Sequence, residues 1–131
     1  MLNRKHILVF LFILISVSLV YSQKLPQITG VYSNFQYGKE SGELIGMEVN
    51  IVYSTDGKNV QYYALVQEAK GVANPPVLAQ VKVNKDEIEF TISDKQMNRT
   101  FRGKISKKAL VGKFEGNDEA IQLKRKKSYW Q

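Results

Sequence analysis

The sequence predicts an all-β protein, a single antiparallel meander of about eight strands that closes into an up-and-down barrel. Apolar and polar residues alternate with period two over most of the chain after residue 28, as in strands with one buried and one solvated face. The connections are too short for crossover helices, so neighbouring strands run antiparallel. Eight strands suffice to close a sheet around a narrow interior, and closure removes exposed edges. A two-sheet β-sandwich is the alternative.

Five of these strands follow one another in the second half of the chain. Phe101, Gly103 and Ile105 share one face of their strand, whereas Thr100, Arg102 and Lys104 share the other. Polar turns of three to six residues separate the runs. The expected strands of the whole chain are residues 29–37, 44–54, 59–68, 77–83, 87–92, 99–105, 109–115 and 120–126.

Turn signals divide the first half of the chain in the same way. Gly38 and Gly42 mark a loop between the first two strands. Asp56 and Gly57 predict a hairpin with a type I′ turn, because both residue types tolerate positive φ. Residues 69–76 are expected to form a loop, since the two prolines they contain cannot sit in a central strand.

The first 22 residues have the features of a signal peptide. Arg4 and Lys5 precede an apolar run over residues 7–21, and Ser22 is suited to cleavage before Gln23. We therefore expect a secreted or periplasmic protein, with residues 23–131 forming one β-barrel domain. The alternative is an uncleaved membrane anchor, because the apolar run is only slightly shorter than a spanning helix. Contact with a membrane is expected only through that segment.

The residue types present argue against catalysis. The chain has no cysteine, and its only histidine, His6, lies in the expected signal peptide. Catalysis by Ser-His-Asp or Cys-His groups is therefore excluded from residues 23–131, as is a zinc site built from nitrogen and sulfur. Carboxylate pairs remain at 40 and 43, 87 and 89, and 118 and 119, where charges most simply serve solvation. We expect no enzyme, no cofactor and no metal.

Positive charge is concentrated at the C-terminal end of the chain. Residues 23–98 carry seven basic and nine acidic residues, whereas residues 99–131 carry ten basic and three acidic residues. The alternation places Lys104, Lys113, Lys124 and Lys126 on the outer face of adjacent strands. They are candidates for contact with an anionic surface or with a protein partner that has an acidic surface. The alternative is a solvated wall, and no nucleic acid is expected for an exported chain.

Two positions resemble the lipocalins and their calycin relatives. The step Gly30-Val31-Tyr32 at the start of the first strand is similar to the Gly-x-Trp of that family, with Tyr in place of Trp. Arg125, near the end of the last strand, is placed like the basic residue that packs over that aromatic ring. The resemblance implies a calycin-like barrel and does not identify a ligand.

Tyrosines are the candidate ligand-binding residues. Tyr32, Tyr53 and Tyr62 fall at strand positions that face the lumen, where an apolar ring with a hydroxyl suits an amphipathic ligand. The alternative is ordinary core packing. We therefore expect a non-catalytic binding protein whose barrel holds a small amphipathic ligand. The alternative function is a protein interaction module, such as an inhibitor of a secreted enzyme or a surface interaction domain, with a filled core.

Overall fold

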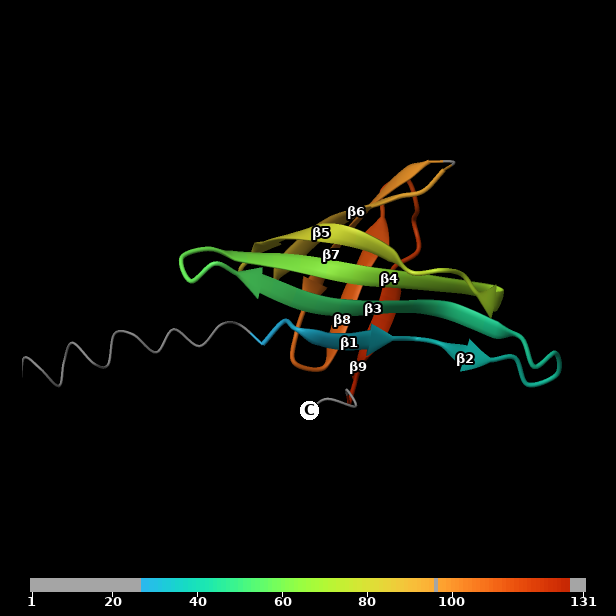
Figure 1. The fold of residues 1–131 in the computed structure, drawn as a ribbon. Helices are drawn as coiled ribbons and strands as arrows, with labels where there is room; N and C mark the ends of the chain where they lie inside the picture. The colour runs from blue at the N-terminus through green and yellow to red at the C-terminus, as the bar shows by residue number, and fades with distance from the viewer. Residues whose placement is uncertain (1–26, 96, 128–131) are drawn as a thin grey trace, which may run out of the picture.

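The structure is a computed structural model that describes residues 27–95 and 97–127 (Figure 1). The described chain is built from strands joined by short connections. Their bounds are β1 Gly30–Ser33, β2 Gln36–Tyr37, β3 Leu44–Thr55, β4 Val60–Ala73, β5 Val77–Asn84, β6 Glu87–Ser93, β7 Asn98–Ile105, β8 Ala109–Phe114 and β9 Ile121–Lys126.

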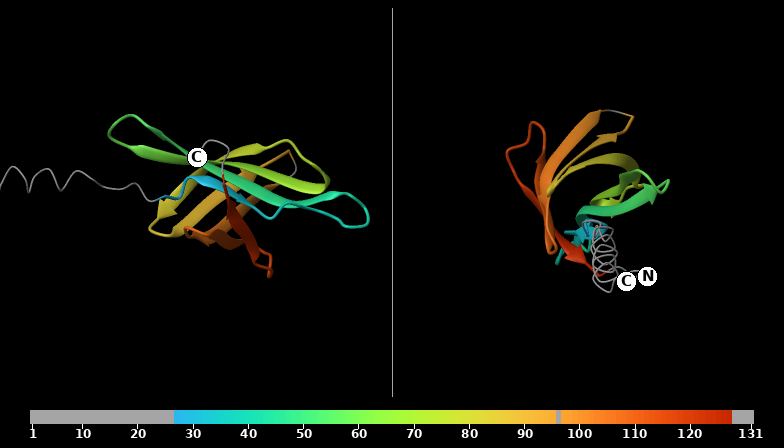
Figure 2. Two further views of the ribbon diagram at one scale, coloured as in Figure 1. Left: turned by 90° about the horizontal axis from the view of Figure 1, so that it is seen from below. Right: turned by 90° about the vertical axis from the view of Figure 1, so that its left-hand side faces the viewer.

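The strands form a closed antiparallel barrel, which confirms the predicted fold class. From β3 to β9 each strand pairs with the next along the chain, and β1 pairs with both β3 and β9. These eight strands form the ring seen along its axis in the right-hand view of Figure 2. The short strand β2 is additional and pairs with β3. Because the hydrogen-bonded ladder is continuous around the ring, the alternative of a two-sheet sandwich is wrong.

Two of the expected strands differ in extent. The expected strand 29–37 is interrupted, since β1 ends at Ser33 and β2 begins at Gln36. The expected strand 59–68 is too short, because β4 continues to Ala73 in register with β3, leaving residues 74–76 as the connection to β5. The pairing of β4 with β5 ends at Val66, whereas its pairing with β3 continues to Gly71, which is opposite Leu44. The last part of β4 is therefore paired on one side only.

The interruption between β1 and β2 arises where Asn34 meets β3. The N–H of Asn34 donates to the Met47 carbonyl at 3.1 Å, but the Met47 N–H donates to Asn34 Oδ1 at 2.7 Å. A side-chain oxygen therefore takes the place of a main-chain carbonyl. Gly46 lies beside this contact at a φ of 117°, and a Cβ there would be 2.6 Å from Asn34 Oδ1. The backbone can bend at Asn34, between β1 and β2, because Gly46 has no side chain to collide with Asn34.

The loop between β3 and β4 is also built differently from the expected type I′ turn. Thr55 pairs with Val60, so the connection spans residues 56–59. Gly57 has the expected positive φ of 87°, but Asp56 does not. Asp56 Oδ1 instead accepts the N–H groups of Asn59 at 2.7 Å and of Lys58 at 2.9 Å. The carboxylate organises the loop, as Asp commonly does in turns.

Aromatic side chains fill the middle of the barrel. The rings of Phe90 and Phe101 stack with centroids 5.0 Å apart, and Phe114 packs edge-on against Phe101 at 5.4 Å. Gly103 and Gly112 pair across β7 and β8, and a Cβ on Gly112 would lie 2.6 Å from the Phe101 ring. These glycines make room for the ring, and the centre is a packed core. The largest fully buried side chains are Tyr32, Phe90, Phe101, Ile51, Leu110, Leu123 and Val49.

The expected signal peptide, residues 1–22, lies outside the described residues. No helix within the described ranges is long and apolar enough to cross a membrane.

Candidate functional site

The three candidate tyrosines do not line one ligand cavity. Tyr32 is fully buried in the core, and its hydroxyl donates to the Ile28 carbonyl at 2.9 Å. Burial raises the pKa of Tyr32 above its ordinary value, and Arg125 partly offsets this. Tyr53 and Tyr62 lie near the β3–β4 loop with ring centroids 6.5 Å apart, and Tyr53 is 49% exposed. The tyrosines therefore serve the core and one end of the barrel.

A hollow lies at the end of the barrel opposite the β3–β4 loop, and we call it the β4–β5 mouth. Its volume is about 700 Å³. Its apolar part consists of Val66 and Ile92, which are buried, and Val77, which is half-buried. Val66 in β4, Ile92 in β6 and Val77 in β5 all occupy inward-facing positions of their strands. The other lining residues are Glu68, Asn74, Pro75, Ser93, Asp94, Lys95 and Arg99.

A two-pronged ion pair crosses the β4–β5 mouth. Arg99 Nη1 donates to Glu68 Oε1 at 3.0 Å, and Arg99 Nη2 donates to Glu68 Oε2 at 2.5 Å. Both side chains are only about a quarter exposed. The guanidinium carbon also lies 4.9 Å from the centroid of the Phe114 ring. Hydrogen bonding to Glu68 raises the pKa of Arg99 despite desolvation, so the cation is held in one place above the aromatic core.

The connection that borders the mouth is anchored to β4. The Asn74 N–H donates to the Glu68 carbonyl at 2.8 Å, and the Gln67 side-chain amide donates to the Asn74 carbonyl at 2.8 Å. The mouth thus has a positioned polar rim above an apolar surface. Its two lining carboxylates are matched by two cations, Lys95 and Arg99. This combination suits a ligand with an apolar body and an uncharged polar head.

The sequence contains a signal for this ion pair. By alternation Arg99 lies on the same face as Phe101, and Glu68 lies on the same face as Val66. Two opposite charges thus occupy inward-facing positions on strands that are not neighbours. Buried charges are rare unless they are paired, so their pairing could have been predicted.

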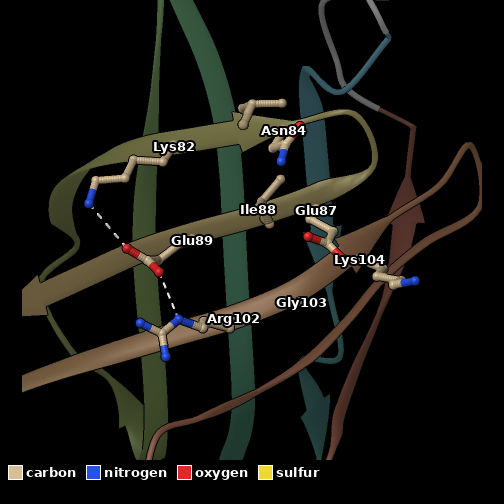
Figure 3. Close-up of a pocket in the computed structure, with 9 residues that line it drawn as sticks. Lys82, Asn84, Glu87, Ile88, Glu89, Arg102, Gly103 and Lys104 are labelled. Carbon is tan, nitrogen blue, oxygen red and sulfur yellow. Dashed lines mark hydrogen bonds and ion pairs between the residues drawn. The ribbon is translucent and has the colours of Figure 1, made fainter.

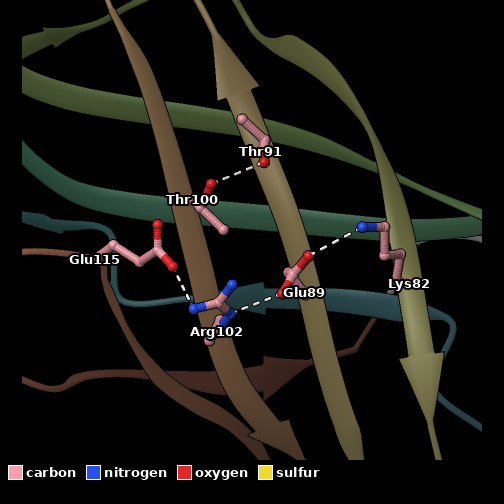
Figure 4. A network of polar contacts seen from close by, with 6 residues as sticks. All are labelled: Lys82, Glu89, Thr91, Thr100, Arg102 and Glu115. Atoms are coloured by element: carbon pink, nitrogen blue, oxygen red, sulfur yellow. Dashed lines mark hydrogen bonds and ion pairs between the residues drawn. The ribbon is translucent and has the colours of Figure 1, made fainter.

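A second hollow, of about 430 Å³, lies on the outer wall of β5, β6 and β7 (Figure 3). Three of its charged side chains, Lys82, Glu89 and Arg102, are joined by ion pairs, and we call them with Glu115 the ion-pair row. Lys82 Nζ lies 3.2 Å from Glu89 Oε1, Arg102 Nε lies 2.7 Å from Glu89 Oε2, and Arg102 also contacts Glu115 (Figure 4). Arg102 and Lys82 hold the pKa of Glu89 below its ordinary value. The ion-pair row joins β5, β6 and β7 to Glu115, the residue after β8, whereas Glu87 and Lys104 line the hollow without an ion pair to another described residue.

The four candidate lysines are all exposed on β7, β8 and β9. None of them has an ion pair with another residue in the described part of the chain. They do not form one equivalent row. Lys104 is opposite Glu87 and Lys113 is opposite Arg102, so both lie beside the ion-pair row. Lys124 and Lys126 lie farther around the ring, where β9 meets β1.

The described residues contain no group of three or more His, Cys, Asp or Glu side chains that could hold a metal ion. The closed eight-stranded ring is consistent with a calycin-like barrel at the level of fold. Comparisons with protein-family models, curated proteins and solved structures find no match to this chain. Function is therefore inferred from the geometry of the site.

Proposed function

We propose that the protein is a non-catalytic binding protein that holds a small amphipathic ligand at the β4–β5 mouth. The observation that carries this proposal is the position of the Glu68–Arg99 pair beside Val66, Val77 and Ile92. The packed phenylalanines argue against a ligand deep in the barrel, so the expected lumen site moves to the mouth. Export through a cleaved signal peptide remains part of the proposal.

The charge balance of the mouth indicates the ligand class. A carboxylate or an ammonium head would upset the pairing of Glu68 with Arg99, whereas a hydroxyl can accept from the guanidinium or donate to the carboxylate without displacing either. The apolar body would cover Val77, the half-buried member of the apolar surface. An uncharged amphiphile is therefore preferred over charged amphiphiles of the same chain length.

The test compares 1-octanol with octanoate and octylammonium by calorimetric titration of the purified protein. We expect octanol to bind more tightly than either charged analogue. Val77→Lys places a charge in the apolar surface and should abolish binding. The matched control is Val83→Lys, because Val83 is also half-buried but lies near the opposite end of β5.

Val83→Lys should leave octanol binding unchanged. Equal loss in both lysine variants, with both still folded by circular dichroism, would show that the mouth is not the site. Stronger binding of a charged analogue than of octanol would contradict the proposed ligand class.

A further inference from the structure

The ladder that closes the barrel stops early. β1 and β9 pair at three positions, and the last pair is Ser33 with Lys124. Beyond that pair β2 follows β3, while the first part of β9 follows β8. Figure 1 and the left-hand view of Figure 2 both show β2 and β9 diverging. We call this opening between β2 and β9 the seam.

The hydrogen bonds of neighbouring residues show which backbone groups face the seam. The Arg125 N–H donates to the Lys108 carbonyl, so the backbone of Arg125 faces the β8 side. Backbone direction alternates along an antiparallel strand, and therefore Lys124 and Gln122 face β1. Lys124 is paired with Ser33, but Gln122 has no strand partner on the seam side among the described residues. The next rung of the closing ladder is missing.

The opposite edge of the seam shows the same pattern. Asn34 N–H donates to Met47, so Asn34 faces β3, and alternation directs the backbones of Phe35 and Tyr37 toward the seam. The Phe35 N–H donates to Ser33 Oγ at 3.2 Å, so only the Phe35 carbonyl is left to accept a hydrogen bond at the seam. Continuing the β1–β9 register would place Phe35 opposite Gln122. Both edges therefore present main-chain groups without their expected partners in the described chain.

The seam is held apart by the contact of Asn34 with Met47 and by the bare Gly46 beside it. A groove of about 250 Å³ lies there. Its lining residues are Ser33, Asn34, Phe35, Gln36, Gln122, Lys124 and Lys126. The lining contains two cations and no carboxylate.

We propose that the seam binds an extended, acidic segment of a partner protein by strand addition. The segment's backbone would bond to the exposed groups at Gln122 and along β2, and its carboxylates would lie beside Lys124 and Lys126. Strand addition satisfies open edges in this way, and side-chain chemistry sets the preference between partners. This surface is separate from the β4–β5 mouth, so the proposal stands or falls independently of the amphipathic ligand.

The probe is a short capped peptide of alternating Glu and Val, added to isotope-labelled full chain. We expect saturable changes in the amide resonances of Gln122 and Tyr37, and slowed hydrogen exchange of the Gln122 amide. The same peptide with N-methylated valines keeps its charge but loses half of its backbone donors, and it should bind at least about tenfold more weakly. A peptide of alternating Lys and Val should not bind.

Two variants locate the charge and the edge. Lys124→Glu with Lys126→Glu should weaken binding of the acidic peptide by about tenfold or more, whereas Lys113→Glu, outside the groove, should have little effect. Gln122→Pro removes the seam-facing N–H and should therefore weaken binding of the acidic peptide. The β8–β9 hydrogen bonds of Ile121 and Leu123 do not require that N–H, so the pairing with β8 should be kept. Any of three results would overturn the proposal. The first is no change in the resonances of Gln122 and Tyr37, the second is equal binding of the N-methylated peptide, and the third is protection of the Gln122 amide by the chain's own termini.

Discussion

The guanidinium of Arg125 lies over the ring of Tyr32, with its central carbon 5.5 Å from the ring centroid. The same guanidinium donates to the Thr29 carbonyl at 2.6 Å and to the Gln27 carbonyl at 2.8 Å. The Tyr32 hydroxyl donates to Ile28, the residue between them. The side chains of Tyr32 in β1 and Arg125 in β9 thus hold residues 27–29, the segment before β1, in place. They do so beside the β1–β9 pairing, which closes the barrel with only three residue pairs.

The first prediction concerns Arg125. Arg125→Lys should lower the free energy of unfolding by about 2 kcal/mol, because an ammonium cannot reach both carbonyls with the fixed fork of a guanidinium. Urea unfolding followed by circular dichroism measures the change. The adjacent Lys124→Ala, at an exposed site, should stay within about 0.5 kcal/mol of the parent. Similar effects of the two changes would show that Arg125 has no special structural role.

The second prediction follows from the raised pKa of Tyr32. The unfolded tyrosine ionises near its ordinary pKa of 10.0, but the folded one stays protonated to higher pH. Stability is therefore fully present below pH 10 and is lost as the pH rises from there, by up to about 1.4 kcal/mol per pH unit. Tyr32→Phe should remove this part of the slope in unfolding experiments at alkaline pH. Tyr37→Phe, at a 73% exposed position, is the control and should leave the slope intact.

The third prediction tests the origin of the break between β1 and β2. Gly46→Ala would place a Cβ against Asn34 and force a left-handed φ on alanine, at a cost of about 3 kcal/mol in unfolding free energy. Gly42→Ala also has positive φ, at 68°, but meets nothing within 4 Å. It should cost only about 1 kcal/mol. Equal costs would mean that Asn34 does not constrain position 46.

The fourth prediction separates the four exposed lysines. The protein should bind a polyanionic matrix at low ionic strength and elute as added salt screens the charges. Lys124→Glu with Lys126→Glu should lower the salt needed for elution more than Lys104→Glu with Lys113→Glu. The first pair lies beside the β7–β8 turn, which carries Lys107 and Lys108, whereas the second pair lies beside acidic partners of the ion-pair row. If the parent flows through at low salt, the lysines form only a solvated wall.

The barrel was predictable because each ring strand buries one face, which makes alternation visible in a single sequence. The same alternation correctly placed Phe101, Gly103 and Ile105 on one face. The break after Ser33 was not predicted. Ser33 and Asn34 are consecutive polar residues that interrupt the alternation of residues 29–37, but this interruption alone does not specify where the strand ends. The break depends on the contact of Asn34 with Gly46, and only the register of the folded sheet brings these two residues together.

The site was predicted less well for a related reason. Alternation places Tyr32 inward, but whether an inward side chain lines a cavity depends on how much space its neighbours fill. Here the stacked rings of Phe90 and Phe101, with Phe114, occupy the centre. Packing of that kind is a property of the assembled barrel, which is why the ligand site that we propose is at the β4–β5 mouth and not in the lumen.

The most direct test of the central proposal is methyl nuclear magnetic resonance of the full chain during titration with 1-octanol. The proposal expects shifts at the mouth methyls of Val66, Val77 and Ile92, with no change at the core methyls of Val49, Ile51 and Leu110. Shifts led by the core methyls would instead place the ligand inside the barrel, and unchanged spectra at saturating octanol would contradict amphiphile binding at the β4–β5 mouth.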